Sequence, residues 1–288
     1  MSETLATDVV QSALSQWPGE SSSLLQILIH IQQKLGHVPE VVRDLLSEKL
    51  DVQPTTIDGV VSFYSFLSNK PVGHYDIRFS DNIVDRMLGS RELASRLMSN
   101  LGVEAGKHDS AKDVTIDFTS CTGMGDQGPA ALVNGMTLTR LTPERIDAIA
   151  SLVQQGTPVV DWPAGFFEVQ ENLVAGDILL GDWYHAGAAL QAVQSIGRDA
   201  ILEQLGTSGL RGRGGAGFKT GMKWRFCAEA QGAQKVVVCN ADEGEPGTFK
   251  DRLFLQSYAD RLFEGMALCA AIIGAQQGFV YLRGEYRY

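Results

Sequence analysis

The sequence has few cysteines, and none of them are paired in the chain. Its four cysteines are isolated from one another, at Cys121, Cys227, Cys239 and Cys269, and no CxxC motif is present. Scattered thiols of this kind are typical of a reducing compartment rather than of a disulfide framework. They also exclude a self-contained four-cysteine metal site built from close pairs.

Positive charge and long apolar runs are also scarce. The first Lys or Arg is Lys34, so the N-terminus lacks the basic region of a signal peptide. The longest apolar stretch, 266–275, is far shorter than the roughly 20 residues that span a membrane. We therefore expect a cytoplasmic protein with no membrane span. Lys and Arg number 24 against 34 Asp and Glu, a net charge of −10, which argues against a nucleic-acid partner.

The remaining composition is that of a folded chain. Hydrophobic residues make up 44% and charged residues 20% of 288 residues, which favours about two domains with packed cores. Residues 1–70 are predicted to form a helical bundle, because apolar residues recur at helical spacing over 24–35. Further helices are predicted over 40–50 and from Pro54 into the aromatic segment ending at Phe66.

Residues 71–156 alternate between strand and helix signals. Strands are predicted at 74–79, 114–118, 130–133 and 136–141, with a helix over 86–101. Asn134-Gly135 is a strong hairpin turn, and Thr142-Pro143 begins a last helix. This order suits a compact module of thioredoxin-like size. The segment 157–176 is predicted to be a linker, and 177–288 a third region that begins with a helix near 188–205.

Glycine is concentrated in the third region. Seven of the sixteen residues over 206–221 are glycine, and Arg211, Arg213, Lys219 and Lys223 add positive charge. Dense glycine lets backbone amides approach an anion, and the helix predicted from Trp224 favours a phosphate at its N-terminus. The pattern is neither a Walker A loop nor a dinucleotide fingerprint. A single RGG-type RNA segment and a purely structural loop are the alternatives.

An acidic turn follows about twenty residues later. The apolar run 236–239 predicts a strand buried on both faces, and Asn240, Asp242, Glu243 and Glu245 come directly after it. Ligands of open α/β sheets bind beyond the carboxyl ends of strands, so these side chains are predicted to hold sugar hydroxyls and ring N–H groups. A solvated acidic turn is the alternative.

These motifs together resemble the NADH-binding, FMN-carrying subunit of respiratory complex I and its relatives. The resemblance rests on four stretches: 209–218, Lys223-Trp224, 239–252 and 281–286. It implies that the chemistry takes place on FMN and that no side chain is catalytic. The implied FMN contacts are Gly212, Arg213, Gly214, Gly215, Lys223, Asn240, Asp242 and Glu243. The residues implied to lie near NAD(H) are Phe218, Phe226 and Glu245.

The first half resembles the companion subunit of complex I, a helical bundle followed by a thioredoxin-like [2Fe-2S] domain. The resemblance rests on 36–39, 61–66, 73–75 and 126–129. That companion binds its cluster with two cysteine pairs, which would fall here at Ser80 and Asp85 and at Cys121 and Gly125. Only Cys121 is a cysteine, and a [2Fe-2S] cluster takes four protein ligands. No cluster is therefore expected in 71–156, and Cys121 is predicted to be a core residue.

Fusion of the two halves resembles the diaphorase flavin subunit of cytoplasmic NAD-reducing [NiFe] hydrogenases. The implied fold class is α/β: a helical bundle, a thioredoxin-like domain and the first part of a complex-I-type FMN-binding domain. The implied function is electron transfer between NAD(H) and an iron–sulfur subunit that serves a hydrogenase. The alternatives are a flavin component of a formate dehydrogenase or complex-I-like enzyme, and a truncated assembly module. The family's flavin subunit continues further, to a [4Fe-4S] cluster whose ligands are not in these residues.

Overall fold

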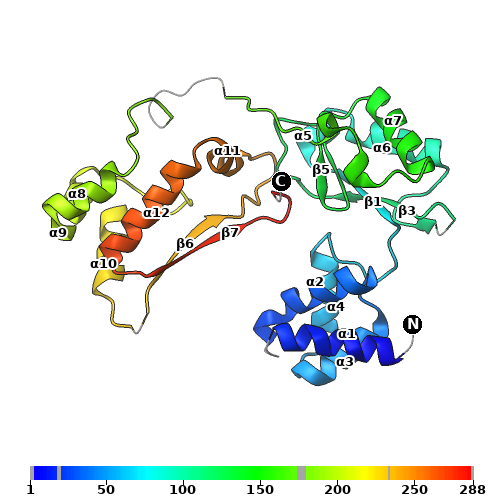
Figure 1. The fold of residues 1–288 in the computed structure, drawn as a ribbon, viewed down its shortest axis with the longest axis horizontal. Helices are drawn as coiled ribbons and strands as arrows, with labels where there is room; N and C mark the ends of the chain where they lie inside the picture. Colours follow the sequence, from blue (N-terminus) through cyan, green and yellow to red (C-terminus); the bar gives the residue numbers. More distant parts are fainter. Residues whose placement is uncertain (1–2, 18–20, 110, 174–179, 233, 287–288) are drawn as a thin grey trace. The chain divides into compact units, whose positions relative to one another are not determined.

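The protein consists of two compact units, described by a computed structural model over residues 3–17, 21–109, 111–173, 180–232 and 234–286 (Figure 1). The first unit covers 1–169 and the second 170–287. The end of the predicted linker and the start of the predicted third region, at 174–179, lie outside the described residues.

The N-terminal part of the first unit is a bundle of helices. Its four α-helices are α1 (Glu3–Gln16), α2 (Leu24–Leu35), α3 (Glu40–Leu50) and α4 (Pro54–Phe63). Apolar side chains from all four form one core, in which Ile27, Ile31 and Leu46 are fully buried. Helix α2 ends at Gly36, whose positive φ of 75° suits glycine. Helices α2 and α3 have the predicted bounds, whereas α1 was not predicted.

The second part of the first unit is a five-stranded sheet with helices packed on it. The strands are β1 (Tyr75–Ser80), β2 (His108–Asp109), β3 (Val114–Thr119), β4 (Ala131–Val133) and β5 (Met136–Leu138). Their order is β2-β3-β1-β4-β5, with β1 and β3 parallel and the other neighbours antiparallel. Helices α6 (Ser90–Leu101) and α7 (Pro143–Gln154) contribute Leu97 and Ile146 to its core.

Local signals set the turns of this sheet. Asn134 and Gly135 both have positive φ, 50° and 81°, as the predicted hairpin requires. The Thr142 hydroxyl accepts a hydrogen bond from the Arg145 amide at 3.3 Å and caps α7 as predicted. The predicted return strand is wrong beyond Leu138, since Arg140 has φ +50° and leaves the extended conformation.

The predicted helix over 86–101 is two helices. Helix α5 (Ile83–Met87) precedes α6, and Gly89, with φ +89°, separates them. The predicted helix over 188–205 divides in the same way into α8 (Ala188–Ile196) and α9 (Arg198–Thr207), because Gly197 has φ +81°. In both places a glycine inside an apolar-periodic segment marks the break.

The first residues after α7 pack on the sheet. Short 3-10 turns cover Val159–Asp161 and Ala164–Phe166, and the Trp162 side chain is buried in the core. The indole N–H of Trp162 and the hydroxyl of Tyr75 both donate to the carbonyl of Thr157, each at 2.9 Å. This part of the predicted linker therefore completes the core of the sheet.

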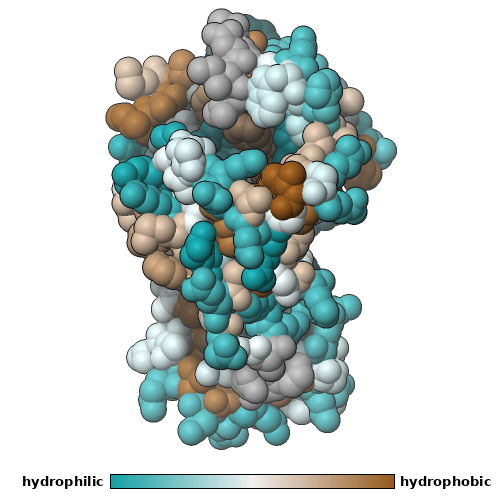
Figure 2. Space-filling view, turned by 90° about the vertical axis from the view of Figure 1, so that its left-hand side faces the viewer, coloured by the Kyte–Doolittle hydropathy of each residue, from teal (hydrophilic) through white to brown (hydrophobic). Residues whose placement is uncertain are grey.

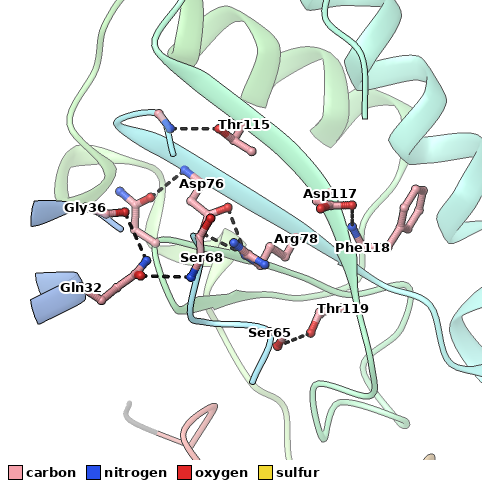
Figure 3. Close-up of polar contacts among 12 residues, drawn as sticks. Gln32, Gly36, Ser65, Ser68, Asp76, Arg78, Thr115, Asp117, Phe118 and Thr119 are labelled. Atoms are coloured by element: carbon pink, nitrogen blue, oxygen red, sulfur yellow. Dashed lines mark hydrogen bonds and ion pairs between the residues drawn. The ribbon is translucent and has the colours of Figure 1, made fainter. Parts of the chain in front are cut away.

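Polar contacts join the helical bundle to the sheet (Figure 3). The Thr119 hydroxyl at the end of β3 donates to the Ser65 hydroxyl at 2.8 Å, and the Ser68 amide donates to Oε1 of Gln32 at 3.0 Å. A pocket of about 830 Å³ lies beside this junction, with Lys70, Arg78 and Lys107 in its lining.

The second unit contains a two-stranded parallel sheet and five helices among its described residues. Besides α8 and α9 these are α10 (Thr220–Glu229), β6 (Val236–Ala241), α11 (Lys250–Ser257), α12 (Ala259–Ile273) and β7 (Gln277–Leu282). Helix α12 contacts α8, α9 and α10 as well as both strands, and Ile272 on it is fully buried (Figure 1). It therefore links the segment before β6 to the sheet.

The prediction that 236–239 is buried on both faces is wrong. Val237 is buried, but Val236 and Val238 are 42% and 58% exposed. Strand β6 pairs with β7 alone in the described chain, and α12 packs against one side of this sheet.

Figure 2 shows the apolar residues of one molecular face as separate brown patches among hydrophilic ones. Among the described residues, no helix is long and apolar enough to cross a membrane.

Candidate functional site

The glycine-rich segment forms a closed loop between α9 and α10. The Gly212 amide donates to the Phe218 carbonyl at 2.8 Å, and the Thr220 amide donates to the Leu210 carbonyl at 2.9 Å. The Arg211 guanidinium closes the loop further by donating to the Gly217 carbonyl at 3.0 Å. Residues 211–216 between these contacts are exposed, and apart from Gly212, whose amide already donates to Phe218, their amides are open to a ligand.

Two glycines have conformations that the loop requires. Gly215 and Gly217 have φ of +103° and +61°, and a Cβ atom at either would meet no atom within 4 Å. The open space beside them and the positive φ together produce a backbone that a ligand can approach closely. This geometry fits the predicted anion cradle.

The two ends of the loop are held together by a backbone contact. A Cβ atom on Gly221 would lie 2.9 Å from the amide nitrogen of Gly206, so only glycine fits there. The C-terminal end of α9 thus lies directly against the first turn of α10.

Positive charge and aromatic rings surround the loop. Arg213 and Lys223 are exposed, and Lys223 stands in the first turn of α10, where unsatisfied amides carry partial positive charge. The Phe218 and Phe226 rings are 6.4 Å apart and about half exposed. The arrangement can bind a phosphate beside an aromatic surface.

The acidic turn and the segment after β7 meet at one edge of the small sheet. The parallel register pairs Asn240 with Tyr281, which brings the two segments that follow these strands side by side. The Asn240 side chain accepts from the Asp242 amide at 3.2 Å, and both residues remain accessible at the strand end. Glu245 is exposed one turn further along.

Glu243 differs from its neighbours because its side chain is buried. Its carboxylate accepts from the backbone amides of Asp251 (2.7 Å) and Arg252 (3.1 Å), which caps α11, and from the Tyr286 hydroxyl (2.8 Å). The Arg283 guanidinium donates to the Glu243 carbonyl at 2.8 Å. These contacts hold Glu243 at φ +46°, a backbone conformation that glutamate rarely adopts.

The network also changes the acidity of Tyr286. Burial, followed by its hydrogen bond to Glu243, raises the pKa of the Tyr286 hydroxyl far above its usual range. The hydroxyl therefore remains a hydrogen-bond donor at physiological pH.

The structure brings the predicted residues together in two groups. The first comprises Gly212, Arg213, Gly214, Gly215, Phe218, Lys223 and Phe226; the second comprises Asn240, Asp242, Glu243 and Glu245. The printed hydrogen bonds that close the glycine loop join residues within 206–220. Helix α10, which follows the loop, contacts α12, and α12 contacts β6, so these two helices link the first group to the second. The site prediction did not include Arg252, Arg283 and Tyr286. Arg283 and Tyr286 could have been found from their place directly after β7, the strand that pairs with β6.

Comparison with known proteins assigns both halves of the chain. Residues 10–154 match the thioredoxin-like [2Fe-2S] ferredoxin family, and residues 205–288 match the Nuo51 FMN-binding domain. The chain belongs to the thioredoxin-like [2Fe-2S] ferredoxin family over its first half and continues into a Nuo51-type domain.

Individual relatives extend this result. The NAD-reducing hydrogenase HoxS subunit alpha of Cupriavidus necator is 36% identical over 97% of this chain and 48% of its own length. An NADH-quinone oxidoreductase subunit of Rhizobium meliloti is 51% identical over 36% of this chain and 25% of its own length. A crystal structure of NAD+-reducing [NiFe]-hydrogenase superposes with a TM-score of 0.80 at 38% identity and covers 92% of this chain and 47% of that one. The chain thus spans about half the length of the hydrogenase relative.

The residues present do not fit a [2Fe-2S] cluster. At the positions expected for its ligands, Ser80 and Asp85 are hydrogen-bonded to each other at 2.6 Å, and Gly125 has no side chain. Cys121 is buried, as predicted. No group of three His, Cys, Asp or Glu residues within the described ranges could hold a metal ion.

Proposed function

We propose that this chain is part of an NAD(H):FMN oxidoreductase, a diaphorase that passes electrons between NAD(H) and an iron–sulfur subunit of an NAD-reducing hydrogenase. The main support is the extent of the similarity. The HoxS subunit alpha matches 97% of this chain, whereas the NADH-quinone oxidoreductase relatives match about a third of it. A hydrogenase diaphorase is therefore favoured over the flavin component of a complex-I-like enzyme.

The glycine loop is proposed to bind the FMN phosphate. The exposed amides of the loop, among them those of Gly214 and Gly215, would donate hydrogen bonds to the phosphate oxygens. Gly212, whose amide already donates to Phe218, would let the phosphate approach the backbone closely. Arg213 and Lys223 would neutralise the phosphate charge. FMN, when bound, supplies the conversion between a two-electron hydride and electrons that leave singly.

The acidic turn is proposed to orient the remainder of the cofactor. Asn240 and Asp242 present amide and carboxylate groups that can bind hydroxyl and ring N–H groups. Glu243 already accepts three hydrogen bonds, so its proposed part in the FMN site is to fix the backbone of the turn. Phe218, Phe226 and Glu245 remain exposed for NAD(H), with the two rings as a stacking surface.

The proposed domains divide this work. Residues 177–288 hold the nucleotide chemistry, while 1–70, 71–156 and the connecting segment 157–176 serve assembly with an iron–sulfur subunit and a hydrogenase module. A cytoplasmic location is part of the proposal, because four isolated thiols suit a reducing compartment.

Flavin binding tests the proposal directly. The purified chain is mixed with FMN, desalted and examined by absorbance before and after NADH is added. Retained flavin that NADH bleaches supports the diaphorase. A folded chain that binds FMN neither alone nor within the assembled complex contradicts it and favours the assembly module.

A further inference from the structure

A buried carboxylate lies at one of the four positions where the family resemblance places cluster ligands. The Asp85 side chain is fully buried, and it accepts three hydrogen bonds. The Ser80 hydroxyl and the Asn82 amide each donate to its Oδ2 at 2.6 Å, and the Ala130 amide donates to Oδ1 at 2.9 Å. Every donor is neutral, and together they satisfy a carboxylate that has no cation among these partners.

These bonds connect three separate segments of the domain. Ser80 ends β1, Asp85 lies in α5, and Ala130 immediately precedes β4. Asn82 adds a cap to α5, since its Oδ1 accepts from the amides of Val84 at 2.8 Å and Asp85 at 3.1 Å. The carboxylate is thus a cross-link between segments that are 45 residues apart in the chain.

The segment that carries the second pair of ligand positions lies alongside. The Asp81 amide donates to the Thr119 carbonyl at 2.9 Å, and the Ser80 hydroxyl also lies 3.3 Å from the Ser120 carbonyl. Cys121 follows directly, buried, and its Sγ accepts from the Gly123 amide at 3.4 Å. The scaffold that would surround a cluster is therefore preserved, although three of the four thiolates are not.

We propose that the Asp85 carboxylate stands in for the family's [2Fe-2S] cluster: it makes the cross-link between these segments that the metal would otherwise make. Iron bound by Asp85 and Ser80 would disrupt the hydrogen bond between these two side chains. A [2Fe-2S] cluster would then need two more protein ligands, and of Cys121 and Gly125 only Cys121 has a side chain that can bind iron. The domain is a structural and docking element, and the electron path does not pass through it.

The first experiment measures stability in the full 288-residue chain. Asp85→Asn replaces an acceptor oxygen by a donor amide and leaves buried donors unsatisfied, which is expected to lower the Tm by about 5–10 °C. Asp147→Asn is the matched control, because Asp147 forms a half-exposed ion pair with Arg96. The control is expected to shift the Tm by no more than about 2 °C. Equal Tm values for the two variants overturn the proposal.

The second experiment restores the thiolates. Ser80→Cys, Asp85→Cys and Gly125→Cys are combined so that Cys121 completes a four-cysteine set. Under anaerobic incubation with iron and sulfide, this triple variant is expected to take up one cluster. Its Tm is expected to be higher with the cluster than without it. The natural chain, treated identically, is expected to take up none.

Two results of that experiment contradict the proposal. A cluster in the natural chain shows that the donor set suffices after all. A folded triple variant that takes up no cluster shows that the carboxylate does not occupy the cluster's position, and if the triple variant does not fold, the comparison of Asp85→Asn with Asp147→Asn decides. Adding Cys121→Ser to the triple variant is the control, and it is expected to reduce cluster retention.

Discussion

The Tyr286 hydroxyl donates a hydrogen bond of 2.8 Å to the carboxylate of Glu243, which lies 43 residues earlier in the chain. Both side chains are buried, and the same carboxylate caps helix α11. The contact therefore ties the acidic turn after β6 to the segment after β7, at the edge where the nucleotide site is proposed.

Tyr286→Phe is expected to destabilise the second unit by about 1.5–3 kcal/mol at neutral pH, since a hydrogen bond to a charged group is lost. Because the folded chain raises the pKa of Tyr286, this stabilisation is fully present below the ordinary tyrosine pKa of 10.0 and is lost as the pH rises above it. The difference between the natural chain and the variant should shrink by about 1.4 kcal/mol per pH unit there. Urea unfolding at neutral pH and about one unit above pH 10.0 measures it.

Tyr281→Phe is the matched control for this pH dependence. Tyr281 lies on β7 and is 58% exposed, so its substitution is expected to change stability by less than about 0.5 kcal/mol at either pH. A constant difference between the natural chain and Tyr286→Phe across the alkaline range would falsify the account of the Glu243 network.

Lys223→Ala is expected to weaken FMN binding about 10- to 100-fold, because one charged hydrogen bond to phosphate contributes about 1.5–3 kcal/mol. Quenching of flavin fluorescence on titration measures the affinity. Lys49→Ala, at an exposed position of α3, removes the same charge far along the chain and should leave the affinity unchanged. Equal affinities for the two variants would remove Lys223 from the phosphate site.

Phe226→Leu is expected to raise the KM for NADH about 2- to 10-fold in the assembled enzyme, since stacking of aromatic rings contributes about 0.5–1.5 kcal/mol beyond burial. FMN content should not change, because Phe226 stands on α10, outside the glycine loop. Phe279→Leu, at another exposed aromatic position of the second unit, is the control. A loss of FMN at unchanged KM would place the ring in the flavin site instead.

Gly128→Ala and Gly59→Ala are expected to change stability in opposite directions. A Cβ atom on Gly128 would lie 2.8 Å from Oδ1 of Asp85 and 2.9 Å from Cδ1 of Leu88, an overlap that costs about 1–3 kcal/mol. A Cβ atom on Gly59, in the exposed part of α4, would meet nothing within 4 Å, and alanine there should stabilise the helix by about 0.5–1 kcal/mol. Thermal unfolding of both variants checks the signs.

The sequence predicted those elements whose signals are local. Helix α3 has the predicted bounds, and the Asn134-Gly135 turn and the Thr142 cap form where their own residues specify them. Contacts between residues far apart in the sequence could not be predicted from local signals. The register that pairs Asn240 with Tyr281 is parallel and spans the two helices α11 and α12, so nothing near Glu243 predicted that its carboxylate would be buried.

The same distinction explains the errors at strand β6. An apolar run predicts burial but does not say which neighbours cover each face, and Val238 lies on the side that α12 does not cover. At Asp85 the family resemblance implied a lost cysteine, and only the fold revealed the donors from Ser80, Asn82 and Ala130 that satisfy the carboxylate.

The contact between Gly206 and Gly221 has a thermodynamic consequence for whatever anion the glycine loop receives. Because the two ends of the loop already touch, the chain entropy of bringing them together is lost during folding and not during binding. Within the loop, Arg211 and Lys219 already pair as an isolated β-bridge. An incoming phosphate therefore needs to order only the exposed amides that lie between these two residues. Affinity at this loop is therefore set by how well a few amides converge on the phosphate, and less by the length of chain that surrounds it.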